Sequence, residues 1–185
     1  QNLAGQGLME SINLDAFLAG VRDVVTGEPR MTQDEMMTAL NTFQQQMMER
    51  QTAQAEAARA ASEAFLAENG ARSEVTTTAS GLQYEVLESG PDDAPSPTAS
   101  DTVLAHYHGT FVDGSVFDSS VDRGEPAEFA LNQVIPGWTE ALQLMSVGDK
   151  WRLFIPAALA YGESGSGPIP PHSTLIFDVE LIAVQ

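Results

Sequence analysis

The residue types in this chain are poorly suited to nucleophilic or metal-assisted catalysis. Cysteine is absent, no Gly-x-Ser-x-Gly segment occurs, and the serines beside Asp118 have no obvious histidine partner. His106 and His108 share one face of an expected strand, but no third ligand follows at a recognisable spacing, so ordinary strand histidines are expected. The glycine-rich segment 162–167 lacks the lysine and the following helix that a phosphate-binding loop needs. We therefore expect no covalent intermediate, no metal and no cofactor.

The residues that remain as candidates are aromatic and apolar side chains of the C-terminal half, interleaved with one acid. Taken singly, each is also compatible with core packing, and Asp118 with capping a turn. Together they favour an apolar binding site. They lie in Ala-His-Tyr-His-Gly at 105–109, Val-Phe-Asp-Ser-Ser at 116–120, Val-Ile-Pro-Gly-Trp at 134–138, Ala-Tyr-Gly at 160–162, Ile-Pro-Pro-His at 169–172 and Leu-Ile-Phe-Asp-Val-Glu at 175–180.

The elements that must position these residues follow a two-residue apolar period, which is typical of β-strands. Strands are expected at 82–88, 102–112, 128–131, 151–155 and 174–184, with a hairpin turn at Asp113-Gly114. The only helix expected between them spans 137–145, with Trp138, Leu142 and Met145 on its apolar side. The pattern predicts an α+β fold, in which an antiparallel half-barrel sheet wraps on one short helix.

Two helices are expected before the sheet. Asn13 can cap the first, whose apolar residues from Leu14 to Val25 follow helical spacing. Thr32 and Glu35 form a capping box that begins the second, which meets no glycine or proline before Asn69-Gly70 and would be roughly 55 Å long. We expect an all-helical dimerisation module at 1–48, a long connecting helix and linker at 49–79, and a catalytic domain at 80–185.

The dimerisation module is inferred from an apolar stripe on the second helix. The stripe ends near residue 48, and from 50 to 64 the only apolar side chains are alanines, as in a helix that is packed at one end and solvated beyond it. Two short helices cannot bury such a stripe by themselves, so a homodimer through the N-terminal helices is expected. The alternative is packing of residues 1–48 on the C-terminal domain of the same chain. The stripe comprises Met36, Met37, Leu40, Phe43, Met47 and Met48.

The charge of the chain excludes one class of partner. With 26 acidic and 8 basic residues the net charge is −18, which makes nucleic acid a poor partner. The acidity fits either a surface tuned for solubility or attraction to basic clients. No apolar run approaches the roughly 20 residues that cross a bilayer. Because the sequence begins with Gln1 and has no leader, we expect that an upstream segment was removed by export or by truncation.

The order and spacing of the six segments resemble the FK506-binding (FKBP-type) peptidyl-prolyl cis/trans isomerases across residues 80–185. Residues 1–79 resemble the helical N-terminal part of the long bacterial macrophage-infectivity-potentiator-like members, although the first helix is shorter here. The resemblance implies isomerase activity on X-Pro bonds, proline-containing unfolded or partly folded proteins as clients, and a homodimer. It also implies a periplasmic or outer-membrane-associated location, with a cytoplasmic one as the alternative.

The same resemblance implies roles for individual residues. Trp138 would form the floor of a pocket, and Tyr161 and the backbone N–H of Ile135 would each bind a substrate carbonyl. Asp118 would form hydrogen bonds near Tyr107, and Arg123 would orient it. The implied walls are Tyr107, Phe117, Phe129, Val134, Ile135, Ile169 and Phe177.

Two departures from the family pattern bear on inhibitors. Ala127 stands where the best-known small eukaryotic members have an aromatic wall, and the loop 163–169 is shorter than theirs. A pocket that is more open on that side is expected, with macrocycles of the FK506/rapamycin class as candidate inhibitors. A rival function is that of a dimeric holdase, which cradles unfolded clients between two arms and has only vestigial isomerase activity.

Overall fold

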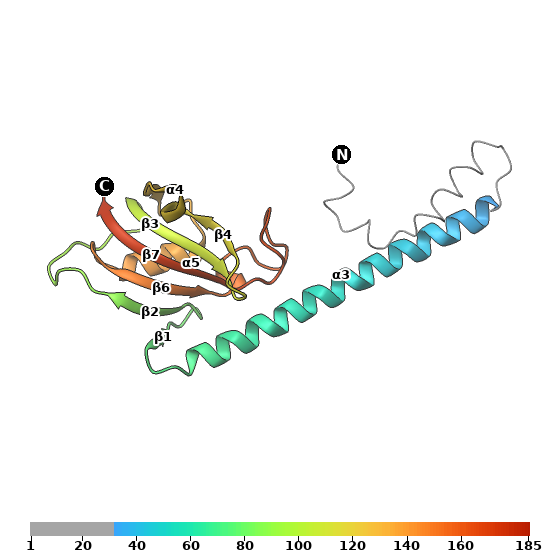
Figure 1. Cartoon of the computed structure of the whole chain (residues 1–185), viewed down its shortest axis with the longest axis horizontal. Coiled ribbons are helices and arrows are strands. Elements are labelled where there is room, and N and C mark those ends of the chain that lie inside the picture. The colour runs from blue at the N-terminus through green and yellow to red at the C-terminus, as the bar shows by residue number, and fades with distance from the viewer. Residues whose placement is uncertain (1–31) are drawn as a thin grey trace. The chain divides into compact units, whose positions relative to one another are not determined.

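The computed structural model describes residues 32–185 (Figure 1). The chain divides into two compact units, with the boundary between Gln51 and Thr52. The helix expected at 13–25, with its cap Asn13, lies outside the described residues. Within residues 32–185, no helix combines the length and the apolarity that a membrane span requires.

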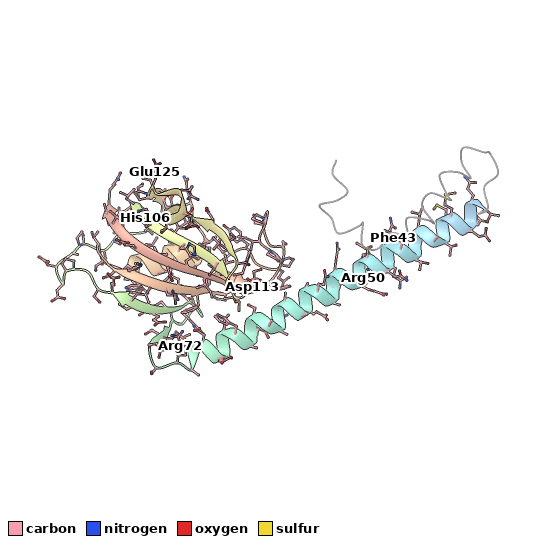
Figure 2. The ribbon with its side chains drawn as sticks, viewed as in Figure 1. Phe43, Arg50, Arg72, His106, Asp113 and Glu125 are labelled. Carbon is pink, nitrogen blue, oxygen red and sulfur yellow. The ribbon has the colours of Figure 1, made fainter. Side chains whose placement is uncertain are left out.

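The long helix α3 (Gln33–Gly70) contains 38 residues, and the capping box that predicts its start is confirmed. The Thr32 backbone N–H donates to Glu35 Oε2 at 2.8 Å, and the Glu35 N–H donates to Thr32 Oγ1 at 3.3 Å. Figure 2 shows the side chains along α3, with Phe43 in its apolar third and Arg50 where the polar stretch begins. The apolar side chains of that third are largely exposed, Met37 to 58% and Leu40 to 50%.

Seven antiparallel strands follow α3, in the sheet order β1-β2-β6-β7-β3-β4, and β5 pairs with β3. The five expected strands, the helix expected at 137–145 and the Asp113-Gly114 turn are all present. The short elements β1, β4, α4 and the 3₁₀ turn η2 were not predicted from the sequence. The bounds are β1 Val75–Thr77, β2 Gln83–Glu88, β3 Thr102–Phe111, β4 Val116–Ser119, α4 Ser120–Arg123, β5 Ala127–Ala130, α5 Pro136–Leu144, β6 Lys150–Ile155, η2 Ala157–Leu159 and β7 Leu175–Val184.

Helix α5 covers the inner face of the sheet and closes the core. Pro136 occupies its first turn, where a missing N–H does no harm. Gly137 then lets the helix approach β6 closely, because a Cβ at this position would lie 2.5 Å from Ile155 Cγ2. Leu142 on α5 and Leu153 on β6 are completely buried between the two layers. The N-terminal turn of α5 is therefore held at a fixed distance from the sheet.

The C-terminal end of α3 docks on the outer face of the sheet. Asn69, which is only 4% exposed, donates from Nδ2 to Gln83 Oε1 at 2.8 Å. Gln83 Nε2 donates in turn to the Leu66 carbonyl oxygen at 2.8 Å, and the Phe65 and Phe154 rings lie 6.0 Å apart. These contacts lie within the unit 52–185, so the last turns of α3 belong structurally to that unit.

We expect Gly137→Ala to lower the free energy of unfolding by about 1–3 kcal/mol, because the added methyl group overpacks Ile155. The sign of this change in unfolding free energy is informative, because Gly→Ala inside a helix normally stabilises the helix by about 1 kcal/mol. Urea denaturation followed by tryptophan fluorescence measures the free energy of unfolding of the unit 52–185, because Trp138 and Trp151 both lie in it. The matched control is Gln143→Ala on the exposed side of α5, and a Gly137→Ala variant at least as stable as wild type would contradict the packing argument.

Candidate active site

A hollow of about 480 Å³ opens over the first turn of α5, within the size range of ligand-binding pockets. Strands β3, β4, β5 and β7 supply one side, and the segments before α5 and after η2 supply the other. Most of the lining is aromatic or aliphatic. The lining residues are Tyr107, Phe117, Asp118, Phe129, Gln133, Val134, Ile135, Trp138, Ala160, Tyr161 and Phe177.

The indole of Trp138 lies at the centre of this lining and is held by three other rings. Phe129, Phe177 and Tyr107 meet it edge to face, with centroid distances of 5.0, 5.3 and 5.6 Å. Such pairs are worth about 0.5–1.5 kcal/mol each beyond their buried area. The indole is 4% exposed, and its buried Nε1–H has no hydrogen-bond partner within residues 32–185.

Gly109 allows the rings of the opposite wall to close over β3. A Cβ at this position would lie 2.7 Å from Phe117 Cζ and 2.9 Å from Phe177 Cε1. The two rings meet edge to face with centroids 5.4 Å apart. Residue 109 must therefore lack a side chain for these two rings to stand as they do.

A polar cluster of Tyr107, Asp118 and Arg123 occupies the rim. The Tyr107 hydroxyl donates to Asp118 Oδ2 at 2.5 Å, Arg123 donates to Asp118 Oδ1, and Arg123 also donates to the Tyr107 hydroxyl oxygen at 2.7 Å. The Tyr107 backbone N–H is fixed by Ser120 Oγ at 2.8 Å. The expected contacts of Asp118 with Tyr107 and Arg123 are thus present, and the Asp118 side chain is 47% exposed.

The contacts of this cluster raise the pKa of Tyr107 and lower the pKa of Asp118. Burial, followed by the hydrogen bond to the Asp118 carboxylate, raises the pKa of Tyr107. Partial burial is the largest single influence on Asp118 and acts upward, but the hydrogen bonds from Tyr107 and Arg123 together outweigh it and leave the pKa of Asp118 below its ordinary value. Near neutral pH the cluster therefore consists of a phenol, a carboxylate and a guanidinium.

Two hydrogen-bond donors line the hollow at separate segments. Tyr161, 40% exposed, follows η2, and its hydroxyl makes no hydrogen bond among the residues that the structure describes. Ile135 precedes α5 in an extended conformation (φ −60°, ψ 147°), and its N–H is likewise without an acceptor in that part of the chain. Donors so placed can bind carbonyl oxygens of a polypeptide lying across the hollow.

The structure brings together most, but not all, of the expected site residues. Ile169 is 8% exposed and does not line the hollow, and Arg123 reaches only its rim. Gln133 lines the hollow and was missed, because a lone amide carries no recognisable signal. Ala160 also lines it and was noted only as part of the segment 160–162, without a role of its own. His106 and His108 lie against Ser120 and Ser119, with Nδ1–Oγ distances of 3.1 and 2.9 Å.

Comparison with known proteins identifies two family matches. Residues 94–182 match the family described as FKBP-type peptidyl-prolyl cis-trans isomerase, and residues 1–86 match the domain amino terminal to it. Among solved structures, FkpA from Escherichia coli superposes with a TM-score of 0.81 at 38% identity, covering 94% of this chain and 83% of that one.

Similar proteins of known sequence agree with this assignment. The FKBP-type 22 kDa peptidyl-prolyl cis-trans isomerase of Escherichia coli is 47% identical over 100% of this chain and 89% of its own length. The outer membrane protein MIP of Legionella longbeachae is 42% identical (100% and 80%), and FkpA of Aeromonas hydrophila is 47% identical (94% and 66%). The chain belongs to the FKBP-type peptidyl-prolyl cis-trans isomerases.

Proposed function

We propose that this chain accelerates cis/trans rotation of X-Pro bonds in unfolded or partly folded proteins, by binding the prolyl group non-covalently over Trp138. The observation that carries the proposal is an aromatic hollow of about 480 Å³ with a hydrogen-bonded polar rim on one side. A hollow of this kind accepts a proline ring and leaves the flanking backbone within reach of polar groups.

Non-covalent binding is sufficient for this reaction. Amide resonance gives X-Pro rotation a barrier of about 18–20 kcal/mol, and the uncatalysed exchange takes tens to hundreds of seconds. In the twisted transition state the C–N bond loses its double-bond character and the carbonyl becomes less dipolar. An apolar hollow therefore favours the twisted state over the planar one, which is differential binding of the transition state.

We assign a role to each residue from its position in the hollow. Phe117, Phe129 and Phe177, with Val134 and Ile135, form the walls that exclude water, and Trp138 forms the floor. The Tyr161 hydroxyl and the Ile135 N–H bind carbonyls on either side of the turning bond. Asp118 holds Tyr107 in place and presents its carboxylate to the hollow, and Arg123 is a positioning residue for both.

We expect Phe117→Ala and Asp118→Ala each to lower kcat/KM on a proline tetrapeptide by about tenfold or more, equal to about 1.4 kcal/mol of transition-state binding. The readout is a protease-coupled isomerisation assay. The matched controls are Val116→Ala on the same strand and Asp122→Ala, both exposed and outside the hollow. Near-wild-type turnover of both site variants would refute the proposed roles.

We also expect kcat/KM to be independent of pH between about 5 and 9 for a substrate that does not itself titrate. Asp118 stays ionised because its pKa is held below the usual value of about 3.9, and Tyr107 stays protonated because its pKa is raised above about 10. Stability due to ionised Asp118 is present above about pH 4 and is lost as the pH falls through its lowered pKa. NMR exchange spectroscopy measures the rates, and a sigmoidal step inside the window would contradict the assignment.

A homodimer through the N-terminal helices forms part of the proposal, with residues 1–48 as its module, 49–79 as connecting helix and linker, and 80–185 as catalytic domain. The supporting observation is the exposed apolar third of α3, where Leu40 is 50% and Phe43 39% exposed in the single chain. Apolar surface of this kind marks contact with another protein surface.

Phe43→Glu is expected to convert the dimer to a monomer, because it places a charge in the apolar contact. Light scattering after size-exclusion chromatography gives the mass of each form. Gln44→Glu, which adds the same charge at the next, exposed position, should remain dimeric. A monomeric wild type, or a Phe43→Glu dimer of unchanged stability, would exclude this interface.

The holdase function is the second candidate, and the long α3 favours it because separated arms would leave room for clients. Truncation to residues 52–185, which keeps the docked turns of α3, separates the two functions. If only the full chain suppresses client aggregation and peptide turnover survives, both functions exist on separate parts. If the short form has no turnover, the holdase function prevails.

Location and inhibition complete the proposal. We place the protein in the periplasm or at the outer membrane, since one relative is named an outer membrane protein. Macrocycles of the FK506/rapamycin class are the proposed inhibitors, and Ala127, which pairs with Ala105 on the neighbouring strand, supplies no aromatic wall to them. FK506 added to the peptide assay tests this inhibition, and cell fractionation tests the location.

A further inference from the structure

A second hollow, of about 270 Å³, lies between α3 and the segment that follows β6. We call it the helix cleft. Arg59, Glu63 and Leu66 line it from α3, and Ala158, Gly162 and Glu163 line it from the opposite side. Leu66 and the alanine supply apolar surface, while the two glutamates and the arginine stand at its edge. All of these residues belong to the unit 52–185.

Both walls of the helix cleft are fixed. On the helix side, Ser62 Oγ is hydrogen-bonded to the Thr174 hydroxyl, which is 2% exposed. On the opposite side, the Gly162 N–H donates to the Ala157 carbonyl oxygen at 2.8 Å, and the His172 N–H donates to the Gly162 carbonyl oxygen at 3.1 Å. The cleft is therefore a preformed feature of the fold.

One short segment supplies lining residues to both the helix cleft and the proposed active site. Ala160 and Tyr161 line the prolyl hollow, whereas the next two residues, Gly162 and Glu163, line the helix cleft. Consecutive Cα atoms are 3.8 Å apart, so residues that line the two hollows lie within a few ångströms of each other at Tyr161 and Gly162. The helix cleft is therefore within a few residues' reach of a polypeptide that crosses the prolyl hollow and continues past Tyr161.

We propose that the helix cleft is an extended subsite that binds the stretch of client polypeptide flanking the isomerised proline. The inference rests on the proposed isomerase function. The apolar surface of Leu66 and Ala158 fits an aliphatic or aromatic client side chain. Of the charged groups at the edge, Glu63 pairs with Arg59 at 2.8 Å, and Glu163 adds a further negative charge that favours a neutral or basic neighbour in the client.

With this subsite the protein turns over long peptides more efficiently than short ones. An assay that uses only a tetrapeptide does not detect this preference. A four-residue peptide centred on Trp138 fills the prolyl hollow and ends near Tyr161. A peptide extended by eight residues reaches the helix cleft on one of its two sides. The helix α3 thereby becomes part of the substrate-binding surface of its own catalytic unit.

The test compares one tetrapeptide with two peptides that carry the same core, extended by eight uncharged residues before or after the proline. NMR exchange spectroscopy gives kcat/KM for the full chain and for two variants that block the cleft from opposite walls, Ala158→Trp and Glu63→Trp. Ala64→Trp is the matched control, because it adds the same side chain to α3 at an exposed residue outside the cleft.

Wild type should turn over one extended peptide about tenfold more efficiently than the tetrapeptide, the scale expected for burying one apolar side chain. Both blocking variants should abolish that gain, and Ala64→Trp should retain it. Equal turnover of all three peptides by wild type, or a gain that survives in either blocking variant, overturns the subsite. Turnover of the tetrapeptide by wild type tests the isomerase function separately, so the two failures are distinguishable.

Discussion

The close approach of α5 to β6 is the constraint on which the site depends. With glycine at 137, the first turn of the helix lies against Ile155, and the next residue, Trp138, is delivered into the ring cluster on the inner face of the sheet. Gly109 permits a similarly close approach on the opposite wall, where the Phe117 and Phe177 rings pack directly on the glycine backbone. Two glycines thus set the width of the hollow, and the aromatic residues fill the space that remains.

The polar rim shows how an acidic protein keeps one carboxylate in a defined state. Asp118 receives hydrogen bonds from a phenol and a guanidinium at once, so its charge is neutralised locally. Arg123 is one of only eight basic residues in the chain, and it is used at this rim. A second cation, Arg152, forms a two-pronged ion pair with Asp178 on the outer face, at 2.6 and 2.7 Å. Both of these arginines therefore hold neighbouring carboxylates in position.

The parts of the fold that were predictable are those with local signals. Thr32 and Glu35 marked the start of α3, and alternation of apolar and polar residues marked the long strands β3 and β7. The three residues of β1 are too few to show a period. Strand β4 carries Phe117 and Asp118 but spans only four residues after a turn, so its pairing with β3 decides its structure rather than its own pattern.

The site was less predictable than the fold. The aromatic residues were grouped by family resemblance, since each of them alone is also an ordinary core residue. Ile169 shows the limit of that approach, because the loop before it departs from the family pattern and the residue packs into the core instead of lining the hollow. The helix cleft carries no sequence signal at all. It exists because Asn69, Gln83 and Ser62 dock α3 onto the sheet through contacts far apart in the chain.

The buried N–H of Trp138 has a consequence for engineering. Among residues 32–185 this donor has no acceptor, and leaving a buried donor unpaired costs about 1–3 kcal/mol. The same indole makes three edge-to-face ring contacts of about 0.5–1.5 kcal/mol each, which act in the opposite direction. The two contributions are of similar size, so fold stability by itself does not select for tryptophan at the floor of the hollow. A screen for heat resistance therefore leaves position 138 open to exchange unless it also measures turnover.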